Sequence, residues 1–195
     1  MHHPALFQKE GKYGMSTYSN KDIPAGTIII REKMKNIHTL TRLSDEYAFA
    51  LIAEMLKTYE DQFKKLVPFE LDATINIDYE TIRKRHDKYL PLLSREDAII
   101  AYAKYKRNAF SFNMNPGFLF YATKLNHSCN PHVKYYPDNN TMVFETIRPI
   151  KANSEVFDSY INSWLPYEER QQLLMKRYGF TCKCEKCKKR AYADK

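Results

Sequence analysis

The sequence predicts an α+β fold, because two strand-rich segments flank a helical one and a further helix precedes a C-terminal group of cysteines. Residues 11–32 and 132–160 have turn residues between short apolar runs, which is typical of short strands. Residues 44–108 have apolar side chains at helical spacing instead. Of the 195 residues, 44% are hydrophobic and 28% are charged, as in a globular protein with one domain and an insertion.

The first two segments each contain local signals for their elements. Pro-Ala-Gly at 24–26 predicts a turn between two short strands. Ser44 is a candidate N-cap for a helix that ends before Pro68. The apolar face of that helix would consist of Tyr47, Leu51, Met55, Leu56, Tyr59 and Phe63. Ser94 starts a sequence that resembles a capping box, and it predicts a second helix that ends near Asn108.

The C-terminal half returns to strands and then ends in a helix. Residues 132–147 read HVKYY, PDNN and TMVFETI, which predicts two strands joined by a turn, and EVFDSY at 155–160 predicts another strand. Pro166–Tyr178 fits a helix with proline near its first turn. Gly179 follows it and can take the left-handed conformation that ends helices.

Only four cysteines occur in the chain, and three of them form a C-x-C-x-x-C cluster at Cys182, Cys184 and Cys187. Structural zinc sites in proteins normally have four ligands, so one more donor is needed. The remaining cysteine, Cys129, would complete an all-cysteine site. From spacing alone, the fourth ligand stays open between Cys129 and other donors, namely His127, His132 or water.

Charge and hydropathy limit the partners and the compartment. No apolar run approaches the ~20 residues that span a bilayer, and no secretory signal is visible, so we expect an intracellular protein of nucleus or cytoplasm without a membrane partner. Clustered cysteines in a reducing compartment are more often metal ligands than disulfides. The net charge of +8 suggests contact with nucleic acid, but a solvated, lysine-rich surface is the preferred explanation, because no basic stripe with interleaved aromatic residues occurs elsewhere.

Four motifs in order resemble the SET-domain protein lysine methyltransferases: GMSTYSNKDIPAGTII, LNHSCNP, ANSEVFDSY and CKCEKC. The sequence is most similar to the subfamily whose SET domain is split by a MYND zinc finger. Asn108-Ala109-Phe110 and the stretch EERQQLLMKRYGFTCKCEKC carry that similarity. The finger itself is missing, since Ile37 to Leu93 contains no cysteine.

The resemblance implies an architecture and an activity. The fold would consist of small β-sheets with a threaded, knot-like crossing, with a SET domain at 1–180, a helical insertion at about 40–107 and a post-SET zinc-binding tail at 181–195. The activity would be transfer of a methyl group from S-adenosylmethionine to the ε-amine of a protein lysine, in a histone or another protein. One structural Zn²⁺ would accompany the cofactor.

The resemblance also implies roles for individual residues. Tyr160 and Tyr178 would be the catalytic tyrosine and a tyrosine of the lysine channel. The cofactor would contact Tyr13, Gly14, Met15, Asn108, Thr123, Asn126, His127, Tyr160 and Phe180. Zinc would be held by Cys129, Cys182, Cys184 and Cys187, which selects Cys129 among the open alternatives.

Three positions depart from the family motifs. Ser16 stands where a second glycine is expected, His132 stands for an asparagine at the crossing, and Asn153-Ser154 replaces Gly-Glu. Because serine has a Cβ, we expect either a small displacement of the backbone at position 16 or an energetic cost of a positive φ there. These departures leave a second hypothesis open, a catalytically weak SET-like module that binds lysine peptides or nucleic acid.

Overall fold

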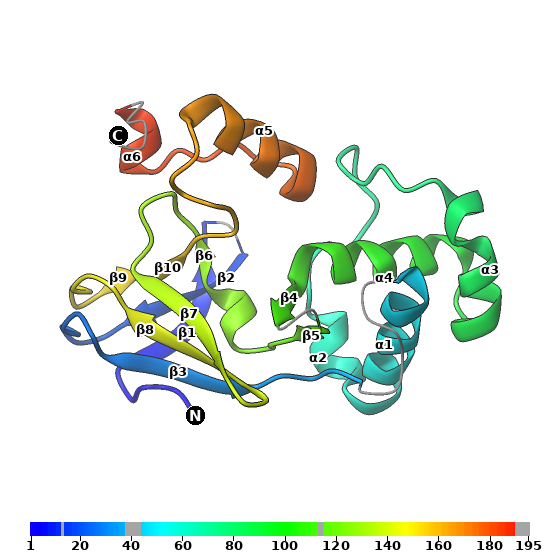
Figure 1. Cartoon of the computed structure of the whole chain (residues 1–195), viewed down its shortest axis with the longest axis horizontal. Coiled ribbons are helices and arrows are strands. Elements are labelled where there is room, and N and C mark those ends of the chain that lie inside the picture. Colours follow the sequence, from blue (N-terminus) through cyan, green and yellow to red (C-terminus); the bar gives the residue numbers. More distant parts are fainter. Residues whose placement is uncertain (13, 38–43, 113–114, 190–195) are drawn as a thin grey trace. The chain divides into compact units, whose positions relative to one another are not determined.

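A computed structural model describes residues 1–12, 14–37, 44–112 and 115–189 (Figure 1). The chain divides into two compact units. The first unit joins Met1–Lys33 to Tyr121–Lys195, and the second is Met34–Phe120. The two strand-rich segments therefore fold together, although the whole helical segment separates them in the sequence. The second unit contains the stretch expected as an insertion.

Two three-stranded sheets form the frame of the first unit. One has the order β1-β2-β9, with β1 (Leu6–Gly11), β2 (Gly14–Ser19) and β9 (Ser154–Glu155). The other has the order β3-β8-β7, with β3 (Ile28–Lys33), β7 (Val133–Asp138) and β8 (Thr141–Thr146). All pairs are antiparallel. The predicted strands and hairpin are confirmed, and Gly26 has the left-handed conformation (φ 79°) that its turn requires. Strand β1 was not predicted.

A short parallel pair holds the middle of the first unit together. Strand β6 (Asn126–His127) follows the 3₁₀ turn η1 (Ala122–Lys124) and pairs with β10 (Phe157–Asp158). The Ser128 amide donates to the Asp158 carbonyl at 2.8 Å, and the His132 amide donates to the Phe157 carbonyl at 2.8 Å. The Nδ1 atom of His132 also accepts the Phe157 amide at 3.1 Å, so the imidazole acts as a hydrogen-bond acceptor at this position.

The predicted C-terminal helix is present in the first unit and precedes the cysteines. Helix α5 (Tyr167–Tyr178) stops at Gly179, whose φ is 76° and whose amide donates to the carbonyls of Leu174 and Met175. This confirms the predicted cap. A short helix, α6 (Glu185–Lys188), lies among the cysteines and was not predicted. Among the described residues, no helix has the length and apolar character needed to cross a membrane.

The second unit is built on helices. They are α1 (Asp45–Thr58), α2 (Glu60–Lys64), α3 (Tyr79–Tyr89) and α4 (Arg95–Asn108), followed by the hairpin of β4 (Ala109–Phe112) and β5 (Asn115–Phe118). Ser44 and Ser94 cap α1 and α4 as predicted, since their hydroxyls accept the amides of Tyr47 and Asp97. The first helix breaks earlier than expected, because Tyr59 leaves helical geometry (φ −136°, ψ 36°). The core gathers the apolar faces, including Tyr47, Phe49, Leu51, Ile52, Met55, Phe63 and Phe118.

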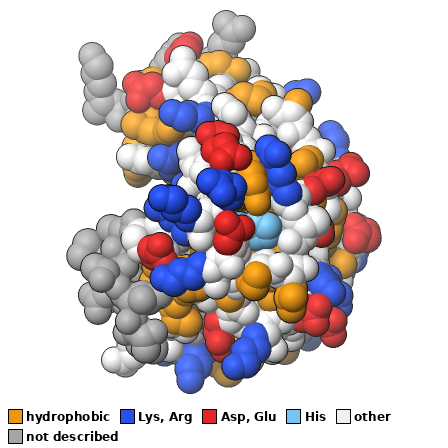
Figure 2. Space-filling model, turned by 90° about the vertical axis from the view of Figure 1, so that its right-hand side faces the viewer, with side chains coloured by type: hydrophobic (Ala, Val, Ile, Leu, Met, Phe, Trp, Pro, Cys, Tyr) orange, Lys and Arg blue, Asp and Glu red, His pale blue; other side chains and the backbone are white. Residues whose placement is uncertain are grey.

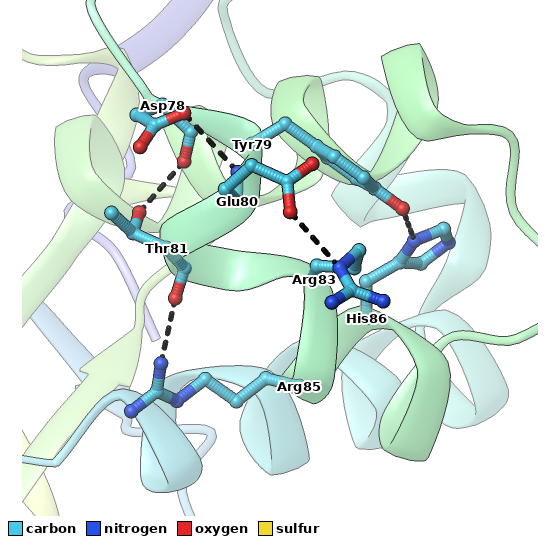
Figure 3. A network of polar contacts seen from close by, with 7 residues as sticks. All are labelled: Asp78, Tyr79, Glu80, Thr81, Arg83, Arg85 and His86. Carbon is cyan, nitrogen blue, oxygen red and sulfur yellow. Dashed lines mark hydrogen bonds and ion pairs between the residues drawn. The ribbon is translucent and has the colours of Figure 1, made fainter.

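Helix α3 was not predicted, because only Ile82 and His86 of its side chains are buried and no apolar stripe is visible. Its place depends on a polar network instead (Figure 3). The His86 ring contacts the Tyr79 hydroxyl through Nδ1 at 2.7 Å and the Leu93 carbonyl through Nε2 at 3.0 Å. Since the carbonyl can only accept, Nε2 donates to Leu93, and the ring thereby ties α3 to the segment that follows it.

Charges of both signs are interspersed on the face of the molecule drawn in Figure 2. The second unit has exposed ion pairs, including Arg83 with Glu80 at 3.0 Å and Lys88 with Glu46 at 3.4 Å. Exposed pairs of this kind contribute little to stability. These pairs place acidic and basic side chains next to one another on the second unit, although the net charge of the chain is +8.

The departures at Ser16 and Asn153 are both accommodated. Asn153 has φ 61°, a left-handed conformation that asparagine tolerates better than most residues. Ser16 is fully buried and is not among the described residues with positive φ, so the expected backbone cost is absent. Space for its side chain comes from Gly11 across the β1–β2 pair. A Cβ at position 11 would lie 2.5 Å from Ser16 Oγ and 3.1 Å from Ser16 Cβ.

This packing predicts that Gly11 and Ser16 are energetically coupled. Gly11→Ala should lower the free energy of unfolding by about 1–3 kcal/mol, because an overpacked site must shift. Ser16→Gly removes the obstructing atoms, so the double variant should lose at least about 1 kcal/mol less than the sum of the single variants. Urea unfolding of the four proteins measures this coupling. Additive single effects would contradict the explanation.

Candidate functional site

The four cysteines of the chain converge in the first unit. Cys129, Cys182 and Cys187 are buried and Cys184 is half-buried, and none is in a disulfide. Their Sγ atoms all lie within 4.8 Å of one another, and those of Cys129 and Cys187 are 3.5 Å apart. The distant cysteine, rather than a histidine, therefore completes the cluster.

The cluster has the chemistry and spacing of a four-thiolate zinc site. With Zn–S bonds of about 2.3 Å, the sulfurs of a tetrahedral site are about 3.8 Å apart, close to the separations found here. Hydrogen bonds from the thiols of Cys129 and then Cys182 lower the pKa of Cys184. A divalent cation would replace these protons, because cysteines bind metals as thiolates.

Helix α5 supplies polar groups to the cluster. Arg170 is fully buried and donates through Nη1 to the Leu165 carbonyl and through Nη2 to Cys187 Sγ at 3.9 Å. The Gln171 amide nitrogen contacts Cys187 Sγ at 3.3 Å, and its oxygen accepts the Cys182 amide at 2.9 Å. Four thiolates around Zn²⁺ have a net charge of −2, so a buried guanidinium beside them offsets part of that charge. Sequence reasoning missed both residues, although they lie in the predicted helix that precedes the cysteine cluster.

His127 connects the cluster to Tyr160. Its Nδ1 accepts the Tyr160 amide at 3.1 Å, so the other ring nitrogen, Nε2, carries the hydrogen and donates to Cys129 Sγ at 3.3 Å. Burial lowers the pKa of His127 to about 4, which keeps the ring neutral at physiological pH. The ring is therefore a fixed spacer between the cysteines and the strand end that bears Tyr160.

Aromatic rings surround Tyr160. Its ring centroid is 5.0 Å from that of Tyr178, 5.3 Å from that of His127 and 6.5 Å from that of Phe180. The Tyr160 hydroxyl donates to the Leu125 carbonyl at 2.9 Å, and the Tyr178 hydroxyl donates to the Tyr160 carbonyl at 3.3 Å. Burial raises the pKa of Tyr160, so this hydroxyl keeps its proton near neutral pH. The group can orient a small polar reactant between aromatic walls.

Asn126 lies next to this aromatic group on β6. Its amide nitrogen donates to Ser16 Oγ and to Glu155 Oε1, both at 2.7 Å. Ser16 in turn donates to the carbonyl of Gly14, which has a left-handed φ of 89°. Hydrogen bonds of Ser16, which departs from the family motif, thereby connect the loop at Gly14 to Asn126 of the NHSC motif.

The remaining residues expected at the cofactor lie in different parts of the chain. Met15 is partly exposed on β2, and Thr123 lies in η1, both in the first unit. Asn108 ends α4 in the second unit, where its amide hydrogens bond the carbonyls of Val67 and Lys104. Tyr13 lies outside the described residues.

Sequence reasoning also missed Asp158, a carboxylate on β10 that is only 4% exposed. It lines a pocket of about 500 Å³ together with the aromatic residues Tyr135, Tyr160 and Trp164. Burial raises the pKa of Asp158 to about 7 from its usual 3.8. The signal in the sequence was weak, because an acid in a short strand such as EVFDSY looks like an exposed polar position.

The buried carboxylate predicts an unusual pH dependence of stability. Between about pH 4 and 7 the folded chain holds a proton on Asp158 that the unfolded chain has released, so the contribution of this group to stability falls as pH rises through that window. Asp158→Asn removes this loss. Relative to wild type, its free energy of unfolding should increase by about 2 kcal/mol between about pH 5.5 and 8.5 in urea titrations.

The exposed Asp22 provides a matched control for that measurement, because it also bears one negative charge in the first unit. Asp22→Asn should change stability by similar, small amounts at both pH values. An Asp158→Asn effect that is equally independent of pH would contradict the assigned burial cost.

Comparison with known proteins identifies the family. The model of the SET domain matches residues 14–161. The SET domain-containing protein L678 of Acanthamoeba polyphaga mimivirus is 30% identical over 189 residues, which cover 90% of this chain and 74% of that protein. Human N-lysine methyltransferase SMYD2 is 26% identical over 68% of this chain, and the matched region is 32% of its own length. A SET and MYND domain-containing protein of Dictyostelium discoideum is 32% identical over 36% of this chain, and the match covers 21% of that protein.

A solved structure has the same fold. The SET domain of LSMT, bound to MeLysine and AdoHcy, superposes with a TM-score of 0.68 over 94% of this chain and 54% of that one. At 16% sequence identity this likeness concerns the fold alone. The small antiparallel sheets, the flanking helices, the order of the motifs and the match over residues 14–161 agree, and the chain therefore belongs to the SET domain family, with SET-and-MYND proteins among its relatives.

Proposed function

We propose that the chain transfers a methyl group from S-adenosylmethionine to the ε-amine of a protein lysine. The observation that carries this proposal is Tyr160, which ends the SET motif EVFDSY with its hydroxyl fixed on the Leu125 carbonyl and with Tyr178, His127 and Phe180 around its ring. Relatives named as lysine methyltransferases support the reaction class. The substrate class is a protein lysine, with histones as one candidate.

Methyl transfer requires a site that orients the lysine nitrogen toward the methyl carbon and that lowers the pKa of the lysine. The nitrogen of a neutral amine must approach the methyl carbon in line with the carbon–sulfur bond, and a fixed geometry supplies much of the rate of such a step. A lysine enters protonated, with an ordinary pKa near ~10.4, and a dry aromatic channel lowers that value. The rings of Tyr160 and Tyr178 would form such walls, and the protonated Tyr160 hydroxyl would orient the reacting nitrogen.

Residues of the first unit would hold the methyl donor. Backbone groups of Gly14 and Met15 and the side chain of Asn126 would contact its methionine end, and His127 and Phe180 would border its adenine. Tyr13, Asn108 and Thr123 remain proposed contacts by motif position. The methyl donor supplies the electrophilic carbon; the protein residues bind it, orient the lysine and exclude water.

We further propose one structural Zn²⁺ on Cys129, Cys182, Cys184 and Cys187. The four converging sulfurs and the neighbouring Arg170 support it. The ion would tie the NHSC segment to the tail and would thereby keep Phe180 and Tyr178 beside Tyr160.

The zinc proposal predicts one equivalent of zinc per chain. Cys129→Ala removes a ligand and should weaken zinc affinity by more than about 100-fold, measured by competition with a chelator. His132→Asn serves as the control, because it removes an alternative donor while keeping a side chain that can accept the Phe157 amide. Unchanged affinity in Cys129→Ala, or a comparable loss in His132→Asn, would contradict the four-cysteine site.

The enzyme proposal predicts a defined effect of Tyr160→Phe. Loss of the orienting hydroxyl should lower the rate of methyl transfer by about 100-fold or more, while binding of S-adenosylmethionine changes only a few-fold. Mass spectrometry of core histones and of a cell lysate after incubation with labelled cofactor would show both the activity and the target class.

Tyr136→Phe is the matched control, because its hydroxyl lies on the exposed face of β7 and bonds only Glu145 among the described residues. Activity that survives Tyr160→Phe would exclude the assigned role. A wild-type protein that binds no S-adenosylmethionine but still binds lysine peptides would support the alternative of a binding module instead.

A further inference from the structure

The pocket beside Tyr160 has a buried acid and exposed aromatic rings. It measures about 500 Å³, and its lining includes Val133, Tyr135, Asp158, Tyr160, Trp164 and Arg177. Trp164, the only tryptophan of the chain, is 71% exposed, and Tyr135 is 43% exposed. Asp158 is 4% exposed, so the carboxylate lies deep while the aromatic rings stand nearer the solvent.

The fold does not neutralise this carboxylate with a cation of its own. Among the described residues, no lysine or arginine lies within ion-pair distance of Asp158. Lys134, which lines the same pocket, pairs with Glu145 at 3.2 Å. A buried carboxylate without a cation is costly, and its charge is stabilised when a cation binds.

The Asp158 carboxylate acts electrostatically on the proposed channel. After burial, its charge is the next contribution that raises the pKa of Tyr160, and it also raises the pKa of Tyr178 and Tyr135. Three tyrosine hydroxyls from different segments are therefore within range of one carboxylate. A cation that enters between the rings meets aromatic faces and this negative charge together, and both attract it.

We propose that the Asp158 carboxylate binds the ammonium group of the target lysine and thereby makes this pocket select a charged lysine over an apolar side chain of equal length. This inference rests on the proposed function, because Tyr160 both lines the pocket and is the proposed catalytic tyrosine. It adds a residue that determines specificity and that the motif resemblance did not assign.

The same arrangement gives the selectivity a pH dependence. Asp158 has a pKa of about 7, so it is more fully charged at pH 8 than at pH 6, whereas a lysine in water, as it enters the pocket, is protonated over that range. The groups that face it are those of its own segment, of β6, of β7 and of α5, namely Tyr160, His127, Lys134, Tyr135, Arg177 and Tyr178. The Nδ1 atom of His127 is occupied as the acceptor of the Tyr160 amide, and burial raises the pKa of the three tyrosines. Asp158 is therefore the group expected to titrate there between about pH 6 and 8.

A binding cycle tests the proposal without turnover. The probes are Nα-acetyl-lysine methylamide and the matching norleucine compound, which lacks the ammonium, each titrated by NMR in the presence of S-adenosylhomocysteine. Wild type should bind the lysine compound at least about 10-fold more tightly at about pH 8. In Asp158→Asn that preference should fall below about 2-fold, with norleucine binding unchanged and with Asp22→Asn behaving as wild type.

Titration of wild type alone provides a second test that needs no variant to fold. Its preference for the lysine compound should increase several-fold between about pH 6 and 8. A lysine preference that persists in Asp158→Asn, or that is independent of pH in wild type, overturns the proposal. Since no methyl is transferred in either measurement, these outcomes are separate from failure of the enzyme proposal, which the Tyr160→Phe assay detects.

Discussion

The first unit depends on one constraint, the convergence of four cysteine sulfurs from two distant segments. Cys129 lies two residues after His127, and Cys182 lies two residues after Phe180. Fixing the sulfurs within 4.8 Å of one another therefore fixes both aromatic residues. His127 transmits this constraint further, because its ring spans from Cys129 Sγ to the Tyr160 amide. The position of the proposed catalytic tyrosine is thus tied to the proposed metal cluster through a single neutral imidazole.

Helix α5 is held by the same cluster and helps to neutralise it. Arg170 cannot be buried without anionic or carbonyl partners, and four thiolates cannot be buried beside one another without positive charge. Arg170 would supply part of the positive charge that the proposed thiolate site requires, and the Gln171 side chain accepts the Cys182 amide. Since Tyr178 ends the same helix and Gly179 turns the chain toward Phe180, the charge balance at one end of α5 positions the aromatic residues at the other.

Local signals were readable from the sequence, and contacts between distant segments were not. Ser44, Ser94 and Gly179 act within one helical turn, so their caps could be predicted from neighbouring residues alone. Helix α3 could not be, because His86 replaces an apolar stripe with hydrogen bonds to Tyr79 and Leu93. Cys129 stood out only because cysteines are few. Asp158 did not stand out, since its burial results from β6, β7 and the following loop meeting around it.

Among the described residues of the first unit, the charged groups of Arg170 and Asp158 are deeply buried, and they differ in whether the fold supplies their partners. Arg170 has its partners inside the fold, in the Leu165 carbonyl and the sulfur of Cys187, so its charge is accounted for by the folded chain itself. Asp158 has no cation among the described residues, and its raised pKa shows that ionisation is disfavoured there. A site selected only for stability would have an apolar residue or a neutral amide at that position. A buried carboxylate that lines a pocket together with aromatic residues, at such a cost, is explained when its cation arrives with the substrate.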